Sequence, residues 1–415
     1  MTKVFCGIDW AERHHDVALV DAEGKLVAKR RIAESADGFT ELMAMLADAG
    51  DSREEPIPVA IETPRGLLVA ALRETDRAIY AINPMAVARY RERHTVSRKK
   101  SDHADAMVLA NILRTDAHAH RPLPADTELA RAVAVLARAA QDAVWRRTKA
   151  LQELRSLLRE YYPGFLAAFH RGGATNLAGP EARQLLALAP TPAAARTLTP
   201  ARIANALRRA GRQRGVDPLA AELHRALRVP QLRQLPLIEQ ALGRQALALL
   251  TTLNAECDNA EQLGHAATEA FQQHPDHEVI TSFPGMGDLS GARLLAEIGD
   301  DRTRFADARA LKAYAGSAPV TRASGRSIAI TRRLVKNDRL NGVGFLWAFA
   351  AMPRPGPAKD HYDRRRARGD RHAAALRHLF NRMLGQLYHC LNTGQTYDPI
   401  KAFGEPADHA EPAAA

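Results

Sequence analysis

The stretch VFCGID, residues 4–9, alternates small and apolar groups and ends on a carboxylate, a pattern typical of a buried β-strand. Two more strand-like runs follow, HDVALV at 15–20 and LVAKRRI at 26–32, and the intervening DAEG at 21–24 is typical of a hairpin turn. The sequence therefore predicts a fold that opens with three antiparallel strands.

Helices and strands then alternate. Ser35 to Asp37 supply N-cap candidates for a helix with Phe39, Leu42, Met43 and Leu46 on one face, and Gly50 fits its end. The next elements are a strand at 57–62, a helix at 66–75, a strand at 78–82, and helical segments at 85–93 and 102–114. The order βββαβαβα is that of an RNase H-like domain, a mixed sheet with helices on its faces. We place this α/β domain at 1–124, where Pro122 and Pro124 end it.

The rest of the chain is predicted to be all-α. Two long segments each carry one apolar stripe, formed by Leu129, Val133, Leu136, Val144, Leu151, Leu154 and Leu158, and by Leu235, Ile238, Leu242, Leu249 and Leu253. They predict an antiparallel coiled-coil arm at 125–275, with a helical insert at about 163–230 that shows no recognisable chemistry. A mainly helical domain at 276–400 and a disordered Pro- and Ala-rich tail at 401–415 complete the chain.

Four acids form the first candidate site. The strand ending at Asp9 is expected to lie beside the strand ending at Glu62, and the i, i+3 pair Asp102 and Asp105 shares one helix face that can cover the same sheet edge. Four carboxylates at close range raise one another's pKa unless cations neutralise them. Two Mg²⁺ ions about 4 Å apart are the usual solution, and they suit phosphodiester chemistry.

The alternative is structural. Asp9 then caps a turn, Glu62 is a surface acid, and Asp102 is the N-cap of the helix that contains Asp105. An apolar strand that delivers Glu62 at its carboxyl end favours the metal site.

Charge and composition indicate the class of partner. The 415 residues suggest two or three domains, and the net charge of +11 with a pI near 9.8 favours a polyanion. Residues 89–100 hold six Lys or Arg against one acid, and residues 322–371 hold thirteen against four. No apolar run approaches the ~20 residues of a bilayer span, so we expect a cytoplasmic protein. The candidate phosphate-binding residues are Arg89, Arg91, Arg93, Arg98, Lys99, Lys100, Arg322, Arg326, Arg332, Arg333 and Lys336.

The C-terminal part holds two further candidates. In FPGMG at 283–287, Gly285 and Gly287 could present backbone N–H groups to a phosphate in a helix-hairpin-helix element, or simply form a turn between helices. Ser324 stands between Arg322 and Arg326, whose cations could favour alkoxide character, although a Ser-Gly pair in a basic loop is more often a turn. The neighbouring Ser317 and Ser327 are instead expected in a turn before Pro319 and in the strand-like run at 328–330.

Several motifs together resemble one family. They are Gly7-Ile8-Asp9, Ile61-Glu62, Ile82-Asn83-Pro84, KSDHADA at 100–106, Pro-Gly-Met-Gly at 284–287, Ala315-Gly316 with Ser324-Gly325, and Tyr397-Asp398. Over nearly the whole chain, the sequence resembles the DEDD transposases of bacterial insertion sequences, the IS-one-ten family of bridge-RNA-guided recombinases. The segment KNDRL at 336–340 and the long insert depart from the expected pattern.

The resemblance implies a mechanism and partners. Asp9, Glu62, Asp102 and Asp105 would bind Mg²⁺, and Ser324 would attack DNA to form a covalent phosphoserine intermediate. The partners implied are donor and target DNA, a structured noncoding guide (bridge) RNA, and further copies of the chain in a dimer or tetramer that acts at the bacterial nucleoid.

Two other functions stay open. A RuvC-like hydrolytic nuclease or Holliday-junction resolvase would need only the four acids, and a nucleic-acid scaffold would need none of them. The Ser324-Gly325 segment and the large basic C-terminal domain argue against the first alternative. The presence of all four acids argues against the second.

Overall fold

The computed structural model describes residues 3–94, 102–325 and 327–403. The chain divides into two compact units, Met1–Ala125 and Asp126–Ala415. None of the described helices combines the length and the apolarity that a membrane span needs.

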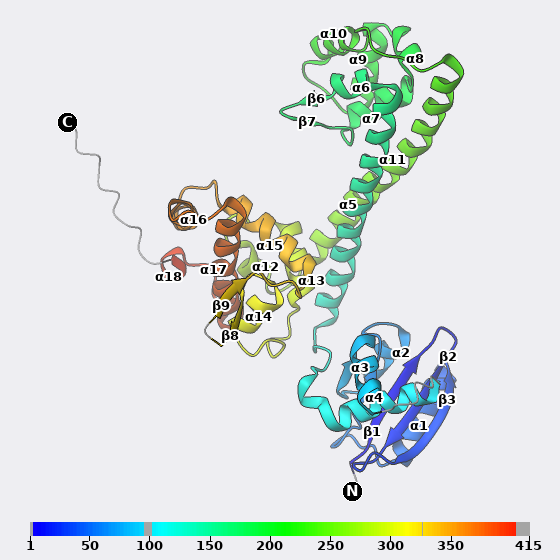
Figure 1. The fold of residues 1–415 in the computed structure, drawn as a ribbon, viewed down its shortest axis with the longest axis vertical. Coiled ribbons are helices and arrows are strands. Elements are labelled where there is room, and N and C mark those ends of the chain that lie inside the picture. The colour runs from blue at the N-terminus through cyan, green and yellow to red at the C-terminus, as the bar shows by residue number, and fades with distance from the viewer. Residues whose placement is uncertain (1–2, 95–101, 326, 404–415) are drawn as a thin grey trace, which may run out of the picture. The chain divides into compact units, whose positions relative to one another are not determined.

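The N-terminal unit contains a five-stranded mixed sheet of order β3-β2-β1-β4-β5 (Figure 1). Its strands are β1 (Phe5–Trp10), β2 (His14–Val20), β3 (Leu26–Ala33), β4 (Val59–Ile61) and β5 (Ile79–Ala81). The first three strands pair antiparallel, whereas β4 is parallel to both β1 and β5. The predicted opening of the fold and the predicted neighbourhood of β1 and β4 are therefore confirmed.

Helices cover both faces of this sheet. They are α1 (Ala36–Asp48), α2 (Leu67–Arg73), α3 (Pro84–His94) and α4 (Asp102–Asp116), with a 3-10 turn at Ala117–Ala119. Because side chains alternate along a strand, Ile8 packs with Leu42 and Leu46 of α1 on one face, while Phe5 packs with Leu109 of α4 on the other. The predicted N-cap, Ser35, accepts a hydrogen bond from Gly38 N at 3.1 Å.

The three cysteines are free thiols. Cys6 and Cys390 are buried, and Cys257 is partly buried. Burial raises the pKa of the Cys6 thiol to about 12, despite the opposing effect of Arg77.

A glycine sets how closely α4 approaches β1. A Cβ atom on Gly7 would lie 2.0 Å from Ala106 O and 2.4 Å from Ala110 N. Both atoms belong to the helix backbone, so they cannot move aside as a flexible side chain could. Gly7 is therefore required for the direct packing of α4 on the central strand.

Replacing Gly7 with alanine is expected to push α4 away from β1 and to destabilise the protein by at least about 1–3 kcal/mol, the usual cost of overpacking. Urea unfolding of the Gly7→Ala variant measures this loss. Gly342→Ala is the control, because a Cβ atom there meets nothing within 4 Å and alanine favours its helix. Equal stability of Gly7→Ala and the wild-type protein would contradict the packing argument.

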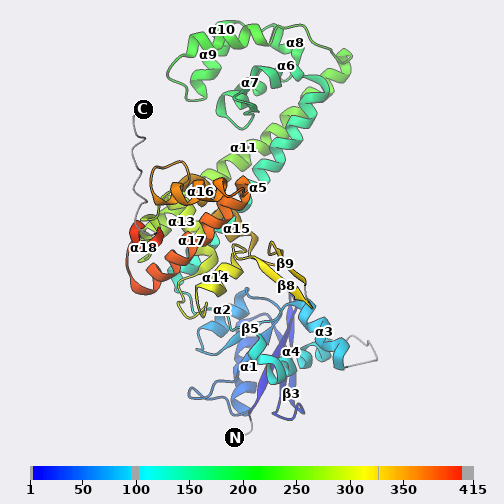
Figure 2. The same ribbon diagram turned by 60° about the vertical axis from the view of Figure 1, so that its left-hand side comes forward.

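Two long helices run through the second unit, α5 (Glu128–Tyr161) and α11 (Pro236–Gln272). The start of α5 and the end of α11 share one core through Val133 and Phe271, and their other ends share a second core through Leu158 and Leu250. The helices are therefore antiparallel (Figures 1 and 2).

The apolar stripe predicted for α11 was partly wrong. Leu235, just before the helix, and Ile238 are 70% and 46% exposed. The buried face carries Leu253, as predicted, together with Gly243, Ala246 and Leu250, which the predicted stripe did not include. Small residues allow two helix backbones to come close together. Gly243 and Ala246 of α11 therefore face the neighbouring elements, whereas the bulky side chains of Leu235 and Ile238 face outward.

An insert of short elements connects the two long helices and packs on the core around Leu158. Its elements are α6 (Pro163–Ala168), β6 (His170–Arg171), β7 (Ala174–Thr175), α7 (Pro180–Leu188), α8 (Pro192–Arg196), α9 (Pro200–Arg209) and α10 (Val216–Ala226). The buried carboxylate of Glu239 accepts two hydrogen bonds from Arg233 and a third from Ala193 N, which ties the insert to the start of α11.

The C-terminal part is mostly helical, as predicted. It comprises α12 (His277–Thr281), α13 (Asp288–Ile298), α14 (Ala308–Tyr314), β8 (Val320–Ser324), β9 (Ser327–Thr331), α15 (Asp338–Ala351), α16 (Pro357–Ala367), α17 (His372–Thr393) and α18 (Pro399–Phe403). Trp347 of α15 and Phe380 of α17 lie in its core together with apolar residues of α13. The tail beyond Phe403 lies outside the described residues.

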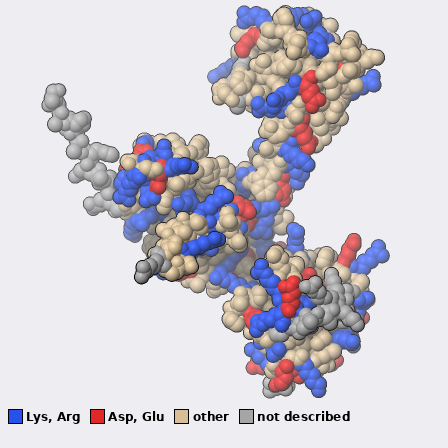
Figure 3. All heavy atoms as spheres, viewed as in Figure 1, with Lys and Arg blue, Asp and Glu red and all other residues tan. Residues whose placement is uncertain are grey.

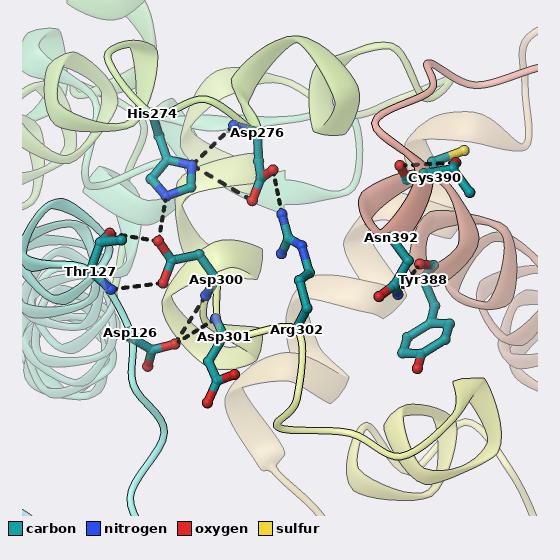
Figure 4. A network of polar contacts seen from close by, with 11 residues as sticks. Asp126, Thr127, His274, Asp276, Asp300, Asp301, Arg302, Tyr388, Cys390 and Asn392 are labelled. Carbon is teal, nitrogen blue, oxygen red and sulfur yellow. Dashed lines mark hydrogen bonds and ion pairs between the residues drawn. The ribbon is translucent and has the colours of Figure 1, made fainter. Parts of the chain in front are cut away.

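A polar network fixes the start of α5 to this core (Figure 4). Thr127 donates to the Asp300 carboxylate from its backbone N at 2.9 Å and from its hydroxyl at 2.5 Å, and His274 Nε2 lies 3.3 Å from the same carboxylate. Asp126 Oδ1 in turn accepts from Asp300 N at 3.0 Å. Burial acts to raise the pKa of Asp300, but the hydrogen bonds from Thr127 and His274 lower it overall. The network therefore has a structural role, because it holds the start of α5 against Asp300.

Candidate active site

A polar cavity of about 510 Å³ opens at one edge of the N-terminal sheet. Three of the four predicted acids line it: Asp9 on β1, Glu62 directly after β4, and Asp105 on α4. The other lining residues are Trp10, Ala11, His14, Asp16, Pro84, Val87, Ala88 and Arg91. Asp102 begins α4 one helical turn before Asp105, and its side chain lies outside the described residues.

Strand register explains why these acids meet. Ile8 pairs with Ile61 in the parallel β1–β4 ladder, so the following residues, Asp9 and Glu62, leave the sheet side by side. Gly7 and Asp9 point to the same face because side chains alternate. α4 packs on this face of the sheet, with Ala106 against Gly7. The preceding residue of the helix, Asp105, therefore lies close to Asp9.

Asp105 is buried, with 5% of its surface exposed, and an ion pair with Arg91 of α3 compensates its charge. The guanidinium of Arg91 thus neutralises Asp105 in the cavity where the sequence predicts Mg²⁺. Among the described side chains, no group of three or more His, Cys, Asp or Glu residues is close enough to hold a metal ion. The donors present are carboxylates, the ligands that Mg²⁺ prefers, so the cavity fits this ion in chemistry.

The second candidate, Ser324, is the last residue of β8, in a β-hairpin rather than in an irregular loop. It pairs in register with Ser327, and both side chains are exposed. Arg322 lies two residues earlier and therefore on the same face of the strand, whereas Arg326 lies outside the described residues. The hairpin thus presents a serine beside a guanidinium to solvent.

Comparison with known proteins gives the family. Residues 6–163 match the transposase model DEDD_Tnp_IS110, and residues 277–363 match the model of the transposase IS116/IS110/IS902 family. The chain is 60% identical over 402 residues to the IS117 mini-circle protein of Streptomyces coelicolor, a transposase by its description, with 96% of each chain covered.

The chain belongs to the IS110 family of transposases. It is also 29% identical to the 43.6 kDa protein of insertion element IS110 of Streptomyces coelicolor, with 95% of each chain covered. The 44.8 kDa protein of element IS116 from Streptomyces clavuligerus is 29% identical, with 96% of each chain covered. The two matched segments of this transposase contain the acidic cavity and the Ser324 hairpin, respectively.

Sequence reasoning missed one acid of the transposase cavity. Asp16 on β2 lines the cavity, is 2% exposed, and accepts two hydrogen bonds from Arg31 at 3.1 and 2.8 Å. It pairs in register with Asp9. The short connection between the first two strands fixes this register, so the sequence held a signal that could have placed Asp16 there.

The other serine near Ser324 is inaccessible. Ser317 is fully buried, and its hydroxyl donates to Lys312 O at 3.2 Å and to Asn381 Oδ1 at 3.0 Å. It closes the turn after α14, in agreement with the turn expected there.

The remaining predicted phosphate-binding residues that the structure describes lie on α3 and after the β8–β9 hairpin. Arg89 is exposed on α3, and Arg93 of the same helix is 4.0 Å from Asp116, while Arg98, Lys99 and Lys100 lie outside the described residues. Arg332 and Arg333 follow the hairpin, and Lys336 lies 2.6 Å from Asp338.

The two glycines of the 283–287 turn differ in their surroundings. Gly285 has a φ of +77°, and a Cβ atom there would lie 2.5 Å from Ala351 N of α15. Gly287 precedes α13 as its N-cap and meets nothing within 4 Å. A phosphate-binding role for both stays a prediction, and Gly285 has a separate packing role.

Proposed function

We propose that this transposase exchanges DNA strands through a metal-bound site of four carboxylates and a nucleophilic serine, guided by a structured noncoding (bridge) RNA. The observation that carries the proposal is the juxtaposition of Asp9, Glu62 and Asp105 at one cavity of a DEDD transposase segment.

In this proposal Asp9, Glu62, Asp102 and Asp105 hold two Mg²⁺ ions. When bound, such ions stabilise charge on the attacking and leaving oxygens of a phosphodiester. The chain's own contribution is to fix the carboxylates on rigid elements, β1, the end of β4 and α4. Arg91 neutralises Asp105 at the wall of the same cavity, where its guanidinium could also donate to a phosphate oxygen.

Ser324 supplies the nucleophile in the second half of the proposal. Its hydroxyl loses a proton to a base as Oγ bonds to phosphorus, and the bond from phosphorus to a deoxyribose oxygen breaks. The released strand end takes up a proton and leaves. Attack by another strand end on the phosphoserine reverses these steps, so the ester bond energy is kept and the DNA is resealed. Arg322, on the same face of the hairpin, is placed to hold the phosphate.

Reconstitution with purified components tests the proposal. The full chain, Mg²⁺, and donor and target DNA are incubated with or without RNA transcribed from the noncoding flank of the element. We expect recombinant joints only when protein, Mg²⁺ and RNA are all present, and chelation of the metal should remove them. Joints formed equally well without RNA would exclude the guided mechanism, and cleaved but unjoined DNA would favour a hydrolytic nuclease.

A further inference from the structure

The helical insert between α5 and α11 concentrates positive charge. Residues 163–235 contain eleven arginines and no lysine against only three acids, an excess of eight in a chain whose total excess is eleven. Basic side chains are scattered over the insert in Figure 3, and acidic ones are few on that face. Protein surfaces that serve solubility alone usually carry positive and negative side chains in mixture. The excess of positive charge on the insert therefore indicates an anionic partner.

Half of the described arginines already have a structural role. Arg208 pairs with Asp217, Arg212 with Glu181 and Arg233 with Glu239. Arg183 donates to Asn254, and Arg228 donates to the main-chain carbonyls of Arg196, at the end of α8, and of Leu198. The ion pairs among these contacts use Asp217 and Glu181, two of the three acids of the insert.

Five arginines of the insert are exposed and have no acidic partner within the described part of the chain: Arg196, Arg202, Arg209, Arg214 and Arg225. Arg202 and Arg209 are seven residues apart on α9 and so share one face, about 10 Å apart along the helix axis. Ile203 and Leu207 on the opposite face are buried in the insert core, which holds the arginine face outward. Arg214 follows in the connection from α9 to α10.

The aromatic residues of the insert indicate the form of the partner. Binding of single strands relies on exposed aromatic rings that stack on bases. Phe165 and Phe169, by contrast, contact each other with their rings tilted by 37°, and Phe165 is fully buried. No phenylalanine, tyrosine or tryptophan is exposed among the described residues of the insert. Guanidinium groups without stacking rings suit the phosphates of a duplex, which position a protein without reading sequence.

We propose that these five exposed arginines on the surface of the insert (Arg196, Arg202, Arg209, Arg214 and Arg225) bind the phosphate backbone of duplex DNA that flanks the recombining site. Duplex DNA is the polyanion that a transposase must hold. Val133 and Leu158, which mark the two cores along α5, are 25 residues apart, or about 37 Å along the helix. For DNA that runs alongside α5, this length corresponds to about 11 base pairs at 3.4 Å per base pair.

The test measures binding alone and is therefore independent of the acids and of Ser324. Fluorescence anisotropy follows a labelled 40-base-pair DNA duplex, and in parallel an RNA duplex of the same sequence, titrated with full-length protein over a range of salt concentrations. The test variant combines Arg202→Gln, Arg209→Gln and Arg214→Gln. The control removes the same charge from exposed positions of the N-terminal unit through Lys25→Gln, Lys29→Gln and Arg53→Gln.

Each lost phosphate contact should reduce the slope of log K against log salt by about 0.9, so the test variant should lose about 2 to 3 from its slope. Its footprint on DNA should also shorten at the distal end. The control should match the wild-type protein, and the triple Arg→Lys variant should keep most of the slope, which excludes misfolding as the cause.

Three results would overturn the proposal. They are an unchanged slope, an equal loss in the control variant, and a loss seen only with an RNA duplex of the same sequence. The last result would assign the surface to RNA instead of DNA.

Discussion

Replacing Asp105 with alanine is expected to abolish strand exchange, with a rate loss well above the 10- to 100-fold that even an outer-shell partner of a metal site typically costs. Asp105 is the most buried of the described acids in the proposed metal set and lies over the sheet edge beside Asp9. The substitution removes a ligand but little apolar surface. Arg91 loses this one ion pair but is 26% exposed and stays in contact with water, so the fold should be retained.

Two measurements separate the metal role from a structural one. Calorimetric titration with Mg²⁺ should show weaker binding by Asp105→Ala, and by the Asp9, Glu62 and Asp102 alanine variants, while urea unfolding stays near that of the wild-type protein. Asp48→Ala is the control, because this residue is exposed on α1 away from the cavity lining. Normal recombination by Asp105→Ala would remove Asp105 from the metal site.

Replacing Ser324 with alanine is expected to eliminate the covalent protein–DNA adduct while leaving Mg²⁺ and DNA binding intact. Removal of a nucleophilic serine from a hydrolase costs on the order of 10⁶-fold in turnover, so strand exchange should fall by several orders of magnitude. Denaturing gels with labelled DNA, run before and after protease treatment, detect the adduct, and mass spectrometry locates the modified residue.

Ser327 gives a matched control for this experiment. It lies opposite Ser324 in the same hairpin and is equally solvent-facing, so Ser327→Ala makes the same chemical change without removing the proposed nucleophile. This variant should keep both adduct and exchange. Strand exchange by Ser324→Ala at the wild-type rate, or an adduct on another residue, would refute the two-site mechanism and favour hydrolysis.

Local patterns were sufficient to predict much of the N-terminal unit. The alternating small and apolar groups at 4–9 and the strand-like run at 15–20 predicted strands that the structure contains, and both strands are buried along most of their length. The N-cap at Ser35 was predicted equally well, because capping depends only on residues three positions apart. The order of elements then implied that β1 and β4 are neighbours, which brought Asp9 and Glu62 together.

Contacts between segments that are distant in the sequence were harder to predict from local patterns. The ion pair between Arg91 and Asp105 depends on how α3 packs beside α4, and no local pattern encodes that packing. The same limit applies to α11, where Ile238 and Leu250 are both apolar but only Leu250 faces the other helices. Periodicity identifies candidate faces, whereas the neighbouring helix selects the one that becomes buried.

The sequence by itself determined the strand order, the positions of the acids at strand and helix ends, and the excess of charge in the insert, since each depends on spacing or composition. Only the tertiary structure decided which polar groups are buried or exposed. Ser317 and Ser324 are seven residues apart in similar Ala- and Gly-containing surroundings, yet one is enclosed against α17 and the other stands open on a hairpin. The physical reason is that burial is set by what packs over a residue, and here the covering residue, Asn381, is 64 positions away in the chain.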